Sequence, residues 1–303
     1  MRSFHEIAFR LRQEWKNIRY LVAPPRLPEI PFAAPFPILP SPHSVAAKTT
    51  AEYRSQINHY AAQILQHRFP LLGFELETGP EIDWRKDYLS GKSTGTEYFR
   101  RIPYLDPSIA GDHKNIWELS RHQHLVLLAQ AYVLDARAEY LQEIATQLES
   151  WIAANPFQRG INWASALEVA FRALSWLWIL HLVGDRLPAP FVQTLLLSLY
   201  RHGLHLEANL SIYFSPNTHL LGEAVALHAL GALLPQLPRA SYWKNYAGAV
   251  VRRQMDVQVQ QDGSYFEQSS YYHAYALDMF LFHAVLEPPD SIYRDKLHKM
   301  AAY

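Results

Sequence analysis

From about residue 115 to its end, the chain repeats one pattern, an apolar segment of helical period followed by a short break. The breaks hold residues that stop helices, such as Asp262-Gly263 and Pro288-Pro289. Between them the sequence predicts helices near residues 116–134, 137–154, 163–183, 190–208, 218–234, 242–260, 271–286 and 292–303. Because the breaks are short, neighbouring helices must pair as hairpins, with a loose repeat of about fifty residues. The pattern predicts an all-α fold.

Two arrangements of hairpins fit this pattern, an open solenoid or a closed ring called an (α/α) toroid. The segment 163–183 is apolar nearly all round, with Val169, Leu174 and Trp176 on different sides, which indicates burial on several faces. The ring is therefore favoured. We expect it to occupy residues 46–303 and to be incomplete, because the chain stops soon after the last predicted helix.

Residues 1–45 are expected to form an N-terminal helix and a connector. Phe4, Ile7, Leu11 and Trp15 recur at helical spacing, which predicts an amphipathic helix that docks on the protein's own core more readily than on a membrane surface. Charged residues interrupt every apolar run there, so the segment does not read as a signal peptide. Taken alone, this predicts a cytoplasmic protein.

The stretch 23–42 is too rich in proline for a helix or an inner strand. It is expected to be a semi-rigid connector held to the body by Phe32, Phe36 and Ile38. A helix is predicted near residues 50–67, and then short strands and loops.

Composition excludes several functions. Lysine and arginine number 28, as do aspartate and glutamate, so no global field would hold nucleic acid. Cysteine is absent, which removes thiolate metal sites and cysteine nucleophiles. No apolar run reaches the roughly 18 residues of a membrane span. No cofactor motif is present, and the pairs His122/His124 and His202/His205 lack companion carboxylates, so neither a cofactor nor a metal is expected.

A first candidate site lies at residues 215–223. The order Ser-Pro-Asn-Thr places Asn217 or Thr218 at a helix N-cap and His219 in the first turn. Four residues separate His219 from Glu223, so they share a face. A helix N-terminus attracts anions, which suits a substrate carboxylate. A merely capped helix with a His–Glu pair explains the spacing equally well.

A second candidate site spans residues 262–275. Asp-Gly makes a turn, and Ser269 or Ser270 can cap the next helix. Four tyrosines gather here with other polar side chains, more than a structural helix start needs. Tyr272 and Tyr275 share a face, whereas Tyr271 points elsewhere. Aromatic packing at the start of a helix is the alternative.

A third group lies at residues 162–172. Glu168 and Arg172 are four apart inside an apolar helix, which favours an internal ion pair because buried charges need partners. The alternative is a wall of a sugar groove, with Asn162 and Trp163 exposed at the helix start. In a fourth group, Glu118 shares a face with Arg121 or His122.

Together these stretches resemble the N-terminal helical domain of the heparinase II/III-type polysaccharide lyases. The resemblance covers nearly the whole chain. It rests on an N-x-H motif (217–219), a DG-x-x-x-EQS-x-x-YH motif (262–273), a W-E-L-x-R segment (117–121) and an N-W-x-x-x-L-E-x-x-x-R-A segment (162–173). The amphipathic helix and the proline-rich connector fit as well.

The resemblance implies roles for particular residues. Asn217, with His219, neutralises the C5 carboxylate of a uronic acid, and Tyr272 is the phenol that protonates the leaving O4 or also removes the C5 proton. Tyr271 and Tyr275 are close enough in sequence to be confused with Tyr272. Further substrate contacts are expected from Glu223, Glu267, Gln268, His273, Tyr275, Asn162, Trp163 and Arg172, with Glu223 also orienting His219.

The family also implies a bacterial periplasmic location and a C-terminal β-sandwich domain that supplies a further histidine; that domain is expected to be absent here. The chemistry explains the residue types, because a proton next to a carboxylate becomes acidic only when the carboxylate's charge is neutralised by donors. A free tyrosine titrates near 10, so the phenol needs cationic neighbours to act as a base.

The sequence thus predicts a lyase that cleaves an acidic polysaccharide, heparan-sulfate-like or alginate-like, by β-elimination. Two alternatives stay open. A glycoside hydrolase would need two carboxylates flanking the bond, from Glu267, Glu223 or Asp262. A truncated module would bind glycan without cleaving it.

Overall fold

The computed structural model describes residues 3–303 and divides into two compact units. One, the α10–α13 unit, comprises residues 1–16 and 202–303; the other, the α2–α8 unit, comprises residues 17–201. The division falls within two helices, α1 (Phe4–Val22) and α9 (Ala189–Asn209). The domain boundary expected at residue 45 remains a prediction.

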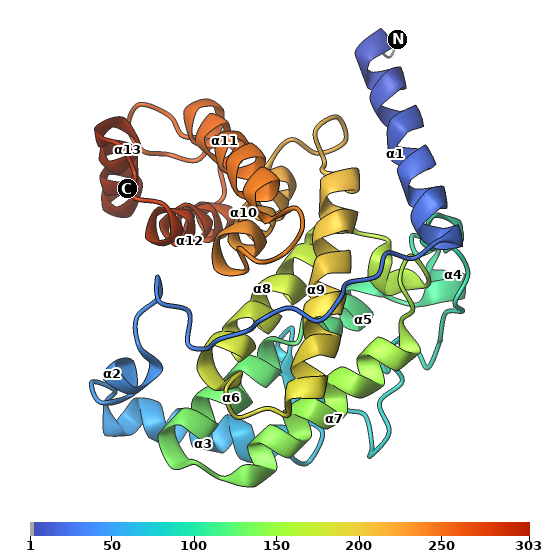
Figure 1. The fold of residues 1–303 in the computed structure, drawn as a ribbon, viewed down its shortest axis with the longest axis vertical. Coiled ribbons are helices and arrows are strands. Elements are labelled where there is room, and N and C mark those ends of the chain that lie inside the picture. The colour runs from blue at the N-terminus through green and yellow to red at the C-terminus, as the bar shows by residue number, and fades with distance from the viewer. Residues whose placement is uncertain (1–2) are drawn as a thin grey trace. The chain divides into compact units, whose positions relative to one another are not determined.

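In the α10–α13 unit, four helices follow one another after short turns, coloured orange to red in Figure 1. They are α10 (Thr218–Leu233), α11 (Ala240–Gln258), α12 (Ser270–Leu286) and α13 (Ser291–Ala302). Helix α10 packs against both α11 and α12 and is buried on almost every side. This position explains why its sequence is apolar all round.

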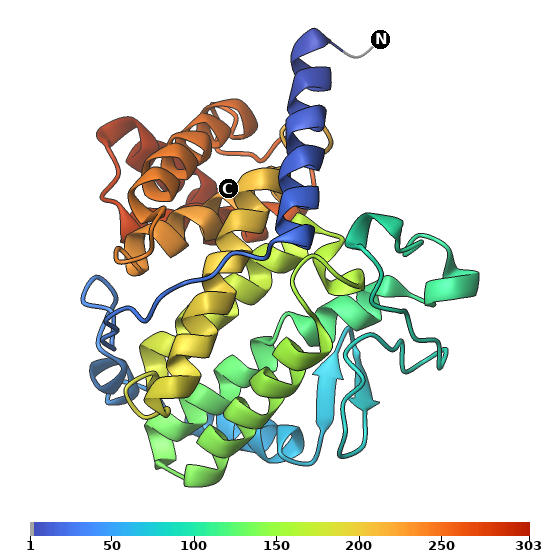
Figure 2. The ribbon, with the colours of Figure 1, turned by 45° about the vertical axis from the view of Figure 1, so that its right-hand side comes forward.

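In the α2–α8 unit, helix α6 packs against α3, α7 and α8. The elements are α2 (Pro42–Ala46), α3 (Ala51–Ile64), β1 (Arg68–Leu71), β2 (Phe74–Glu77), α4 (Pro107–Ala110), α5 (His113–Ser120), α6 (Gln123–Asp135), α7 (Ala138–Ala154) and α8 (Ala166–Val183), with 3₁₀ turns η1 (Phe99–Arg101) and η2 (Ile161–Trp163). Figure 2 shows the two strands, an antiparallel hairpin in which Arg68 pairs with Glu77.

The helix predicted over 116–134 is wrong, because the chain breaks it into α5 and α6 at His122. His122 adopts a left-handed backbone conformation with φ of 59°. Its buried ring stacks on Trp176, which donates an indole N–H to Nδ1 at 2.9 Å, and meets Trp84 and Trp151 edge to face. This aromatic packing offsets the backbone cost, which a non-glycine residue otherwise avoids.

Helix α8 is long and apolar enough to cross a membrane by length and composition, and 83% of it is buried inside the protein. Glu168 and Arg172 interrupt its apolar run, so the sequence alone did not mark it as a candidate span. The expectation concerned uninterrupted apolar runs, and α8 is the one candidate helix found among the described residues when two charged residues are allowed. Burial in a protein core accounts for the same composition.

The apolar stripe of α1 does not dock on the core as expected. Phe4, Leu11 and Trp15 are exposed. The helix is held instead from another side, where Phe9 packs on Tyr213 and Lys16 pairs with Glu207 at 2.9 Å.

The connector is held to the body by Phe36, as expected, and by Leu39 in place of Ile38. Phe36 is buried and stacks on His181, whose Nδ1 accepts the Phe36 N–H at 3.0 Å. Ile38 is exposed and Leu39 is buried in its place.

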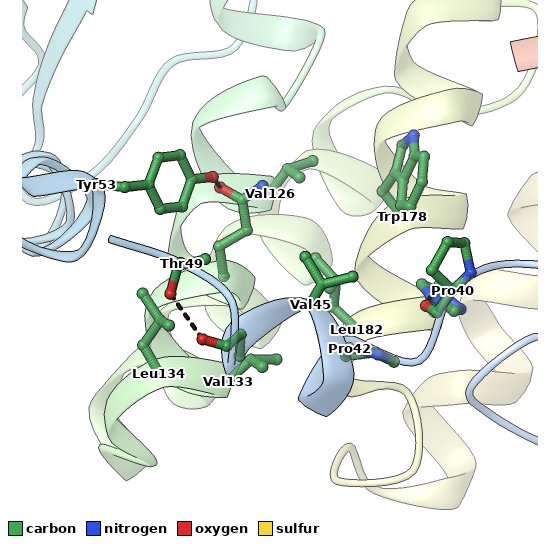
Figure 3. A pocket seen from close by; sticks show the side chains of 13 residues that line it. Pro40, Pro42, Val45, Thr49, Tyr53, Val126, Val133, Leu134, Trp178 and Leu182 are labelled. Carbon is green, nitrogen blue, oxygen red and sulfur yellow. Dashed lines mark hydrogen bonds between the residues drawn. The ribbon is translucent and has the colours of Figure 1, made fainter. Parts of the chain in front are cut away.

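Beside the connector lies an apolar pocket of about 340 Å³ (Figure 3). It is lined by Pro40, Val45, Trp178, Leu182 and neighbours, with no carboxylate, lysine or arginine among its lining residues. Such a lining does not suit an acidic sugar.

The packing of α10 on α11 predicts a stability defect for Gly231→Ala. A Cβ at Gly231 would lie 2.4 Å from the Ala240 carbonyl oxygen and 2.5 Å from the Lys244 nitrogen, both backbone atoms that cannot move alone. We expect the free energy of unfolding in urea to fall by about 1–3 kcal/mol. In the control Gly95→Ala, the added Cβ meets only the end of the Glu97 side chain, and a change below about 0.5 kcal/mol is expected. Equal effects at both positions would contradict this view of the interface.

Candidate active site

Asn217 caps α10, as predicted. Its Oδ1 accepts the backbone N–H of His219 at 3.1 Å and also lies 3.1 Å from His219 Nδ1. Because an amide oxygen only accepts, Nδ1 must carry the proton of this bond. His219 is exposed, and its Nε2 has no hydrogen-bond partner among residues 3–303. The Nε2 edge of the imidazole is therefore left free at the positive end of the helix.

Glu267 binds the cap from a segment fifty residues further along the chain. Its Oε1 accepts the Asn217 amide N–H at 3.0 Å, and its Oε2 accepts the hydroxyl of Thr218. These bonds fix the orientation of the Asn217 amide, with oxygen toward His219 and nitrogen toward Glu267. An amide nitrogen carries two protons, so one remains available to a ligand.

Buried side chains pack beneath the hydrogen bonds from Asn217 and Thr218 to Glu267. Tyr265 donates its hydroxyl to Gln258 at 2.7 Å and lies 3.1 Å from the Thr218 hydroxyl. Gln258 in turn donates to the Pro216 carbonyl oxygen at 3.1 Å. Burial raises the pKa of the Tyr265 phenol, which therefore keeps its proton. The loops before α10 and α12 are thus joined by satisfied hydrogen bonds.

The two tyrosines at the start of α12 are both free to meet a ligand. Ser269 caps this helix, accepting the Tyr272 N–H at 3.4 Å, as predicted. Tyr272 is 45% exposed and Tyr271 is 75% exposed. Neither hydroxyl has a hydrogen-bond partner in the described part of the chain, and the rings meet edge to face at 5.8 Å. Tyr275 is half-buried. The choice among Tyr271, Tyr272 and Tyr275 stays open.

Glu223 does not orient His219, so that expectation is wrong. Its buried carboxyl accepts the N–H and the hydroxyl of Ser211, both at 2.7 Å. Burial raises the pKa of Glu223 to about 8. The carboxyl group holds the loop before α10 from inside the protein. It is too deeply buried to make the substrate contact that the sequence predicted.

Of the other residues expected to contact substrate around α12, His273 is placed elsewhere. Its Nε2 lies 2.9 Å from the Met300 carbonyl oxygen, and its ring packs on Tyr303, so it joins α12 to α13. Gln268 is exposed, in a left-handed conformation with φ of 52°. It remains available for a ligand.

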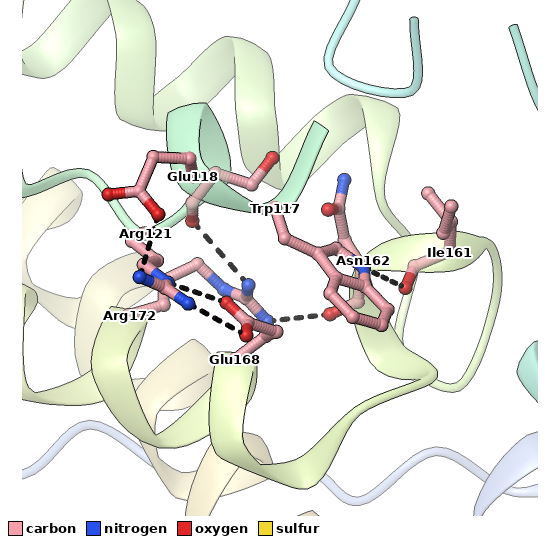
Figure 4. Close-up of polar contacts among 8 residues, drawn as sticks. Trp117, Glu118, Arg121, Ile161, Asn162, Glu168 and Arg172 are labelled. Carbon is pink, nitrogen blue, oxygen red and sulfur yellow. Dashed lines mark hydrogen bonds and ion pairs between the residues drawn. The ribbon is translucent and has the colours of Figure 1, made fainter. Parts of the chain in front are cut away.

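Glu168, expected to pair with Arg172, makes its salt bridge to Arg121 (Figure 4). Arg121 reaches Glu168 with two bonds, Nε to Oε2 at 2.7 Å and Nη2 to Oε1 at 3.0 Å, and also pairs with Glu118 at 2.7 Å. Arg172 donates to the Asn162 carbonyl oxygen at 2.9 Å, and its guanidinium lies 4.2 Å from the Trp151 ring centre. The Glu118–Arg121 pairing follows the expectation. Glu168 also acts on Arg172, because burial lowers the pKa of Arg172 to about 9 and the negative charge of Glu168 partly offsets this.

Asn162, Trp163 and Arg172 do not line an open groove, as one reading of the sequence proposed. All three side chains are buried. Asn162 donates to the Trp84 carbonyl oxygen at 2.8 Å and to Asn155 at 2.9 Å. These residues position their own helix and do not meet a substrate.

Sequence reasoning missed one cluster entirely. His228 of α10 and His283 and Glu287 of α12 place their ligand-type atoms within 4.8 Å of one another. The expectation of no metal site overlooked them because 55 residues separate the two histidines, so no local spacing marks the group.

The chain is similar in sequence and in fold to known proteins. Residues 32–288 match the model of the heparinase II/III N-terminus. The chain belongs to the heparinase II/III family. Among curated members, a heparin-sulfate lyase of Bacteroides stercoris is 27% identical in an alignment of 192 residues that covers 56% of this chain and 28% of that protein. A heparin-sulfate lyase of Pedobacter heparinus is 25% identical in an alignment of 177 residues that covers 56% of this chain and 26% of that protein. The chain thus spans about a quarter of the length of these relatives.

Solved structures of the heparinase II/III family share the fold. A heparinase III matches 88% of this chain and 42% of its own with a TM-score of 0.64 and 22% identity. The heparan sulfate lyase HepC of Pedobacter heparinus matches 97% of this chain and 43% of its own with a TM-score of 0.62 and 19% identity. The family and the helical toroid expected from the sequence are confirmed.

Glu223 predicts a distinctive dependence of stability on pH. A carboxyl whose pKa is raised on folding binds its proton more tightly in the folded state, so stability falls as pH rises from about 4.5 to about 8. The loss is at most about 1.4 kcal/mol per pH unit. We expect Glu223→Gln to flatten this part of the profile in urea unfolding measured from pH 5 to pH 9. The exposed control Glu149→Gln should leave the slope unchanged; an unchanged slope in Glu223→Gln would show that the carboxyl is ionised in the folded protein.

Proposed function

We propose that this chain carries the substrate-carboxylate and proton-transfer groups of a polysaccharide lyase that acts by β-elimination on a uronic-acid-containing glycan. The observation that carries the proposal is the cap of α10. There Glu267 holds the Asn217 amide, which keeps one N–H free to donate, and the free Nε2 edge of His219 lies beside that amide. The chain segment that contains Glu267 leads directly into the exposed Tyr272.

The cap meets the first requirement of the chemistry. Removing the C5 proton places charge on the adjacent carboxylate, and donors already in position stabilise that charge without reorganising. Asn217 offers its second amide proton, and the α10 N-terminus adds its positive end. With its Nδ1 proton committed to Asn217, His219 can donate from Nε2 to a carboxylate only in the imidazolium form.

An exposed phenol meets the second requirement. The C5–H bond breaks, a C4–C5 double bond forms, and the C4–O4 bond breaks as O4 takes a proton. The hydroxyl of Tyr272 has no competing partner in residues 3–303 and can deliver that proton. Tyr271 and Tyr275 are the other candidates for the same step.

The relatives favour a glycosaminoglycan substrate. The curated matches are named heparin-sulfate lyases, and HepC is a heparan sulfate lyase. We infer the same substrate class for this chain and keep a periplasmic location and a β-sandwich partner domain as predictions from the family resemblance.

A hydrolase is less well supported, because Glu223 is buried against Ser211 and Glu267 is already bonded to Asn217 and Thr218. Two carboxylates free to flank a glycosidic bond are therefore not found among the three expected. A module that binds glycan without cleaving it would retain binding in every variant below and show no turnover.

Asn217→Asp tests the charge argument with an almost isosteric change. The new carboxylate keeps an acceptor for the His219 N–H, but it loses the donor and faces Glu267. We expect turnover of a uronic-acid glycan, followed by the ultraviolet absorbance of the new double bond, to fall at least about 100-fold. The double variant Asn217→Asp with Glu267→Gln removes the repulsion and should regain stability without regaining turnover. Wild-type turnover in Asn217→Asp would exclude a role for the amide.

Tyr272→Phe and Tyr271→Phe form a matched pair, because both phenols are exposed and unbonded. We expect Tyr272→Phe to lower turnover by about 100-fold or more while glycan binding, measured by calorimetry, stays the same. Tyr271→Phe should retain turnover. The reverse result would assign the proton transfer to Tyr271, and full activity in both variants would exclude both of these phenols and leave Tyr275 as the phenol of this helix to test.

A further inference from the structure

A second group of polar side chains lies away from the caps, between α10 and α12. His228 projects from α10, and His283 and Glu287 belong to α12 and its C-terminal end. The two imidazoles have their ring centres 4.6 Å apart, and Glu287 Oε2 lies 3.8 Å from His228 Nε2. Both histidines are buried, whereas the Glu287 side chain is 35% exposed.

His228 is oriented so that one ring nitrogen could bind a metal ion. Its Nδ1 donates to the Lys244 carbonyl oxygen at 2.9 Å, which leaves the lone pair of Nε2 directed toward the cluster. A carbonyl bonded to the far nitrogen is the usual device that fixes the tautomer of a metal-binding histidine. Gly248 of α11 leaves room for this ring, because a Cβ there would lie 2.9 Å from Nδ1.

His283 has no such bond. Neither of its nitrogens has a hydrogen-bond partner within residues 3–303, and the same holds for His228 Nε2. Tyr293, which packs on the His283 ring, has its hydroxyl committed to the Phe280 carbonyl oxygen at 3.3 Å. Buried imidazoles without partners are costly, so their presence calls for a ligand.

We propose that His228, His283 and Glu287 bind a divalent transition-metal ion, best matched by Zn²⁺, which ties α10 to α12. Two imidazoles and one carboxylate are a common zinc donor set. Bonds of about 2.0–2.2 Å place ligand atoms in a tetrahedral site about 3.3–3.5 Å apart. Here the ligand atoms lie within 4.8 Å of one another, so binding an ion would draw the three side chains closer together.

Arg252 would compete with this ion for the Glu287 carboxylate. It pairs with Glu287 Oε1 at 2.5 Å, while Oε2 faces His228. Its positive charge opposes a second cation nearby, so it sets an upper limit on affinity. An ion would share the carboxylate with Arg252 or displace it toward solvent, since the Arg252 side chain is 43% exposed.

The position of the cluster suggests its purpose. His228 follows Asn217 by eleven residues along α10, and His283 follows Tyr272 by eleven along α12. Eleven residues of helix span about 16 Å. A metal there would fix the register of the two helices at a distance from the caps. Its role would be structural, and no reaction step would pass through it.

The test is zinc binding by the purified protein after metal removal, followed by calorimetry and by thermal unfolding. We expect one Zn²⁺ per chain and a melting temperature that rises with zinc concentration. His283→Gln should abolish this saturable binding. Glu287→Gln, which alters only a partly exposed side chain, should weaken it at least about 10-fold and keeps the test valid if His283→Gln fails to fold.

A matched arginine pair separates this site from adventitious binding. Arg252→Gln should tighten zinc binding because it removes the competing cation, whereas the exposed neighbour Arg253→Gln should leave affinity unchanged. Absence of saturable binding up to millimolar zinc would overturn the proposal. So would binding of equal strength in the wild type and Glu287→Gln, since the ion would then lie on other histidines.

Discussion

The hydrogen bonds from Asn217 and Thr218 to Glu267 determine how the candidate active site is organised. They join two segments fifty residues apart, and they give a carboxylate at the edge of the protein two donors in place of water. The same bonds decide which way the Asn217 amide points. Behind them, Tyr265 and Gln258 leave few polar atoms unsatisfied, so the loops before α10 and α12 have little freedom to separate.

This arrangement separates support from chemistry. Glu267 and Glu223 both carry carboxyl groups near the cap, yet each is bonded to neighbouring residues and positions backbone or amide groups. Within residues 3–303, the outer edge of His219 and the phenols of Tyr271 and Tyr272 are among the groups left without hydrogen-bond partners. In the α2–α8 unit, Arg121, Glu168 and Arg172 likewise serve the fold, since both carboxylate oxygens of Glu168 bind Arg121.

Local signals in the sequence were sufficient for the helices around the site. Asn217 and Ser269 cap α10 and α12 as predicted, because capping depends on a side chain and the backbone two or three residues away. Local signals failed where a tertiary contact decides the structure. The apolar period continues through His122, and only the surrounding tryptophans reveal the break.

The sequence also did not predict which partners the long charged side chains bind. Spacing favoured Glu168 with Arg172, but Arg121 of the α5–α6 turn binds both oxygens of that carboxylate. Spacing also joined His219 to Glu223, whereas Ser211 binds that carboxyl. The pairing of His228 with His283 required the packing of α10 on α12 to become visible.

Cleavage of a heparan-sulfate-like glycan in ¹⁸O-labelled water, followed by mass spectrometry of the products, tests the central claim most directly. β-Elimination forms the C4–C5 double bond without consuming water, so the products should carry no label and one fragment should lack the mass of a water molecule. Saturated products that carry ¹⁸O would show hydrolysis, and an uncleaved glycan would show that this chain does not perform the elimination.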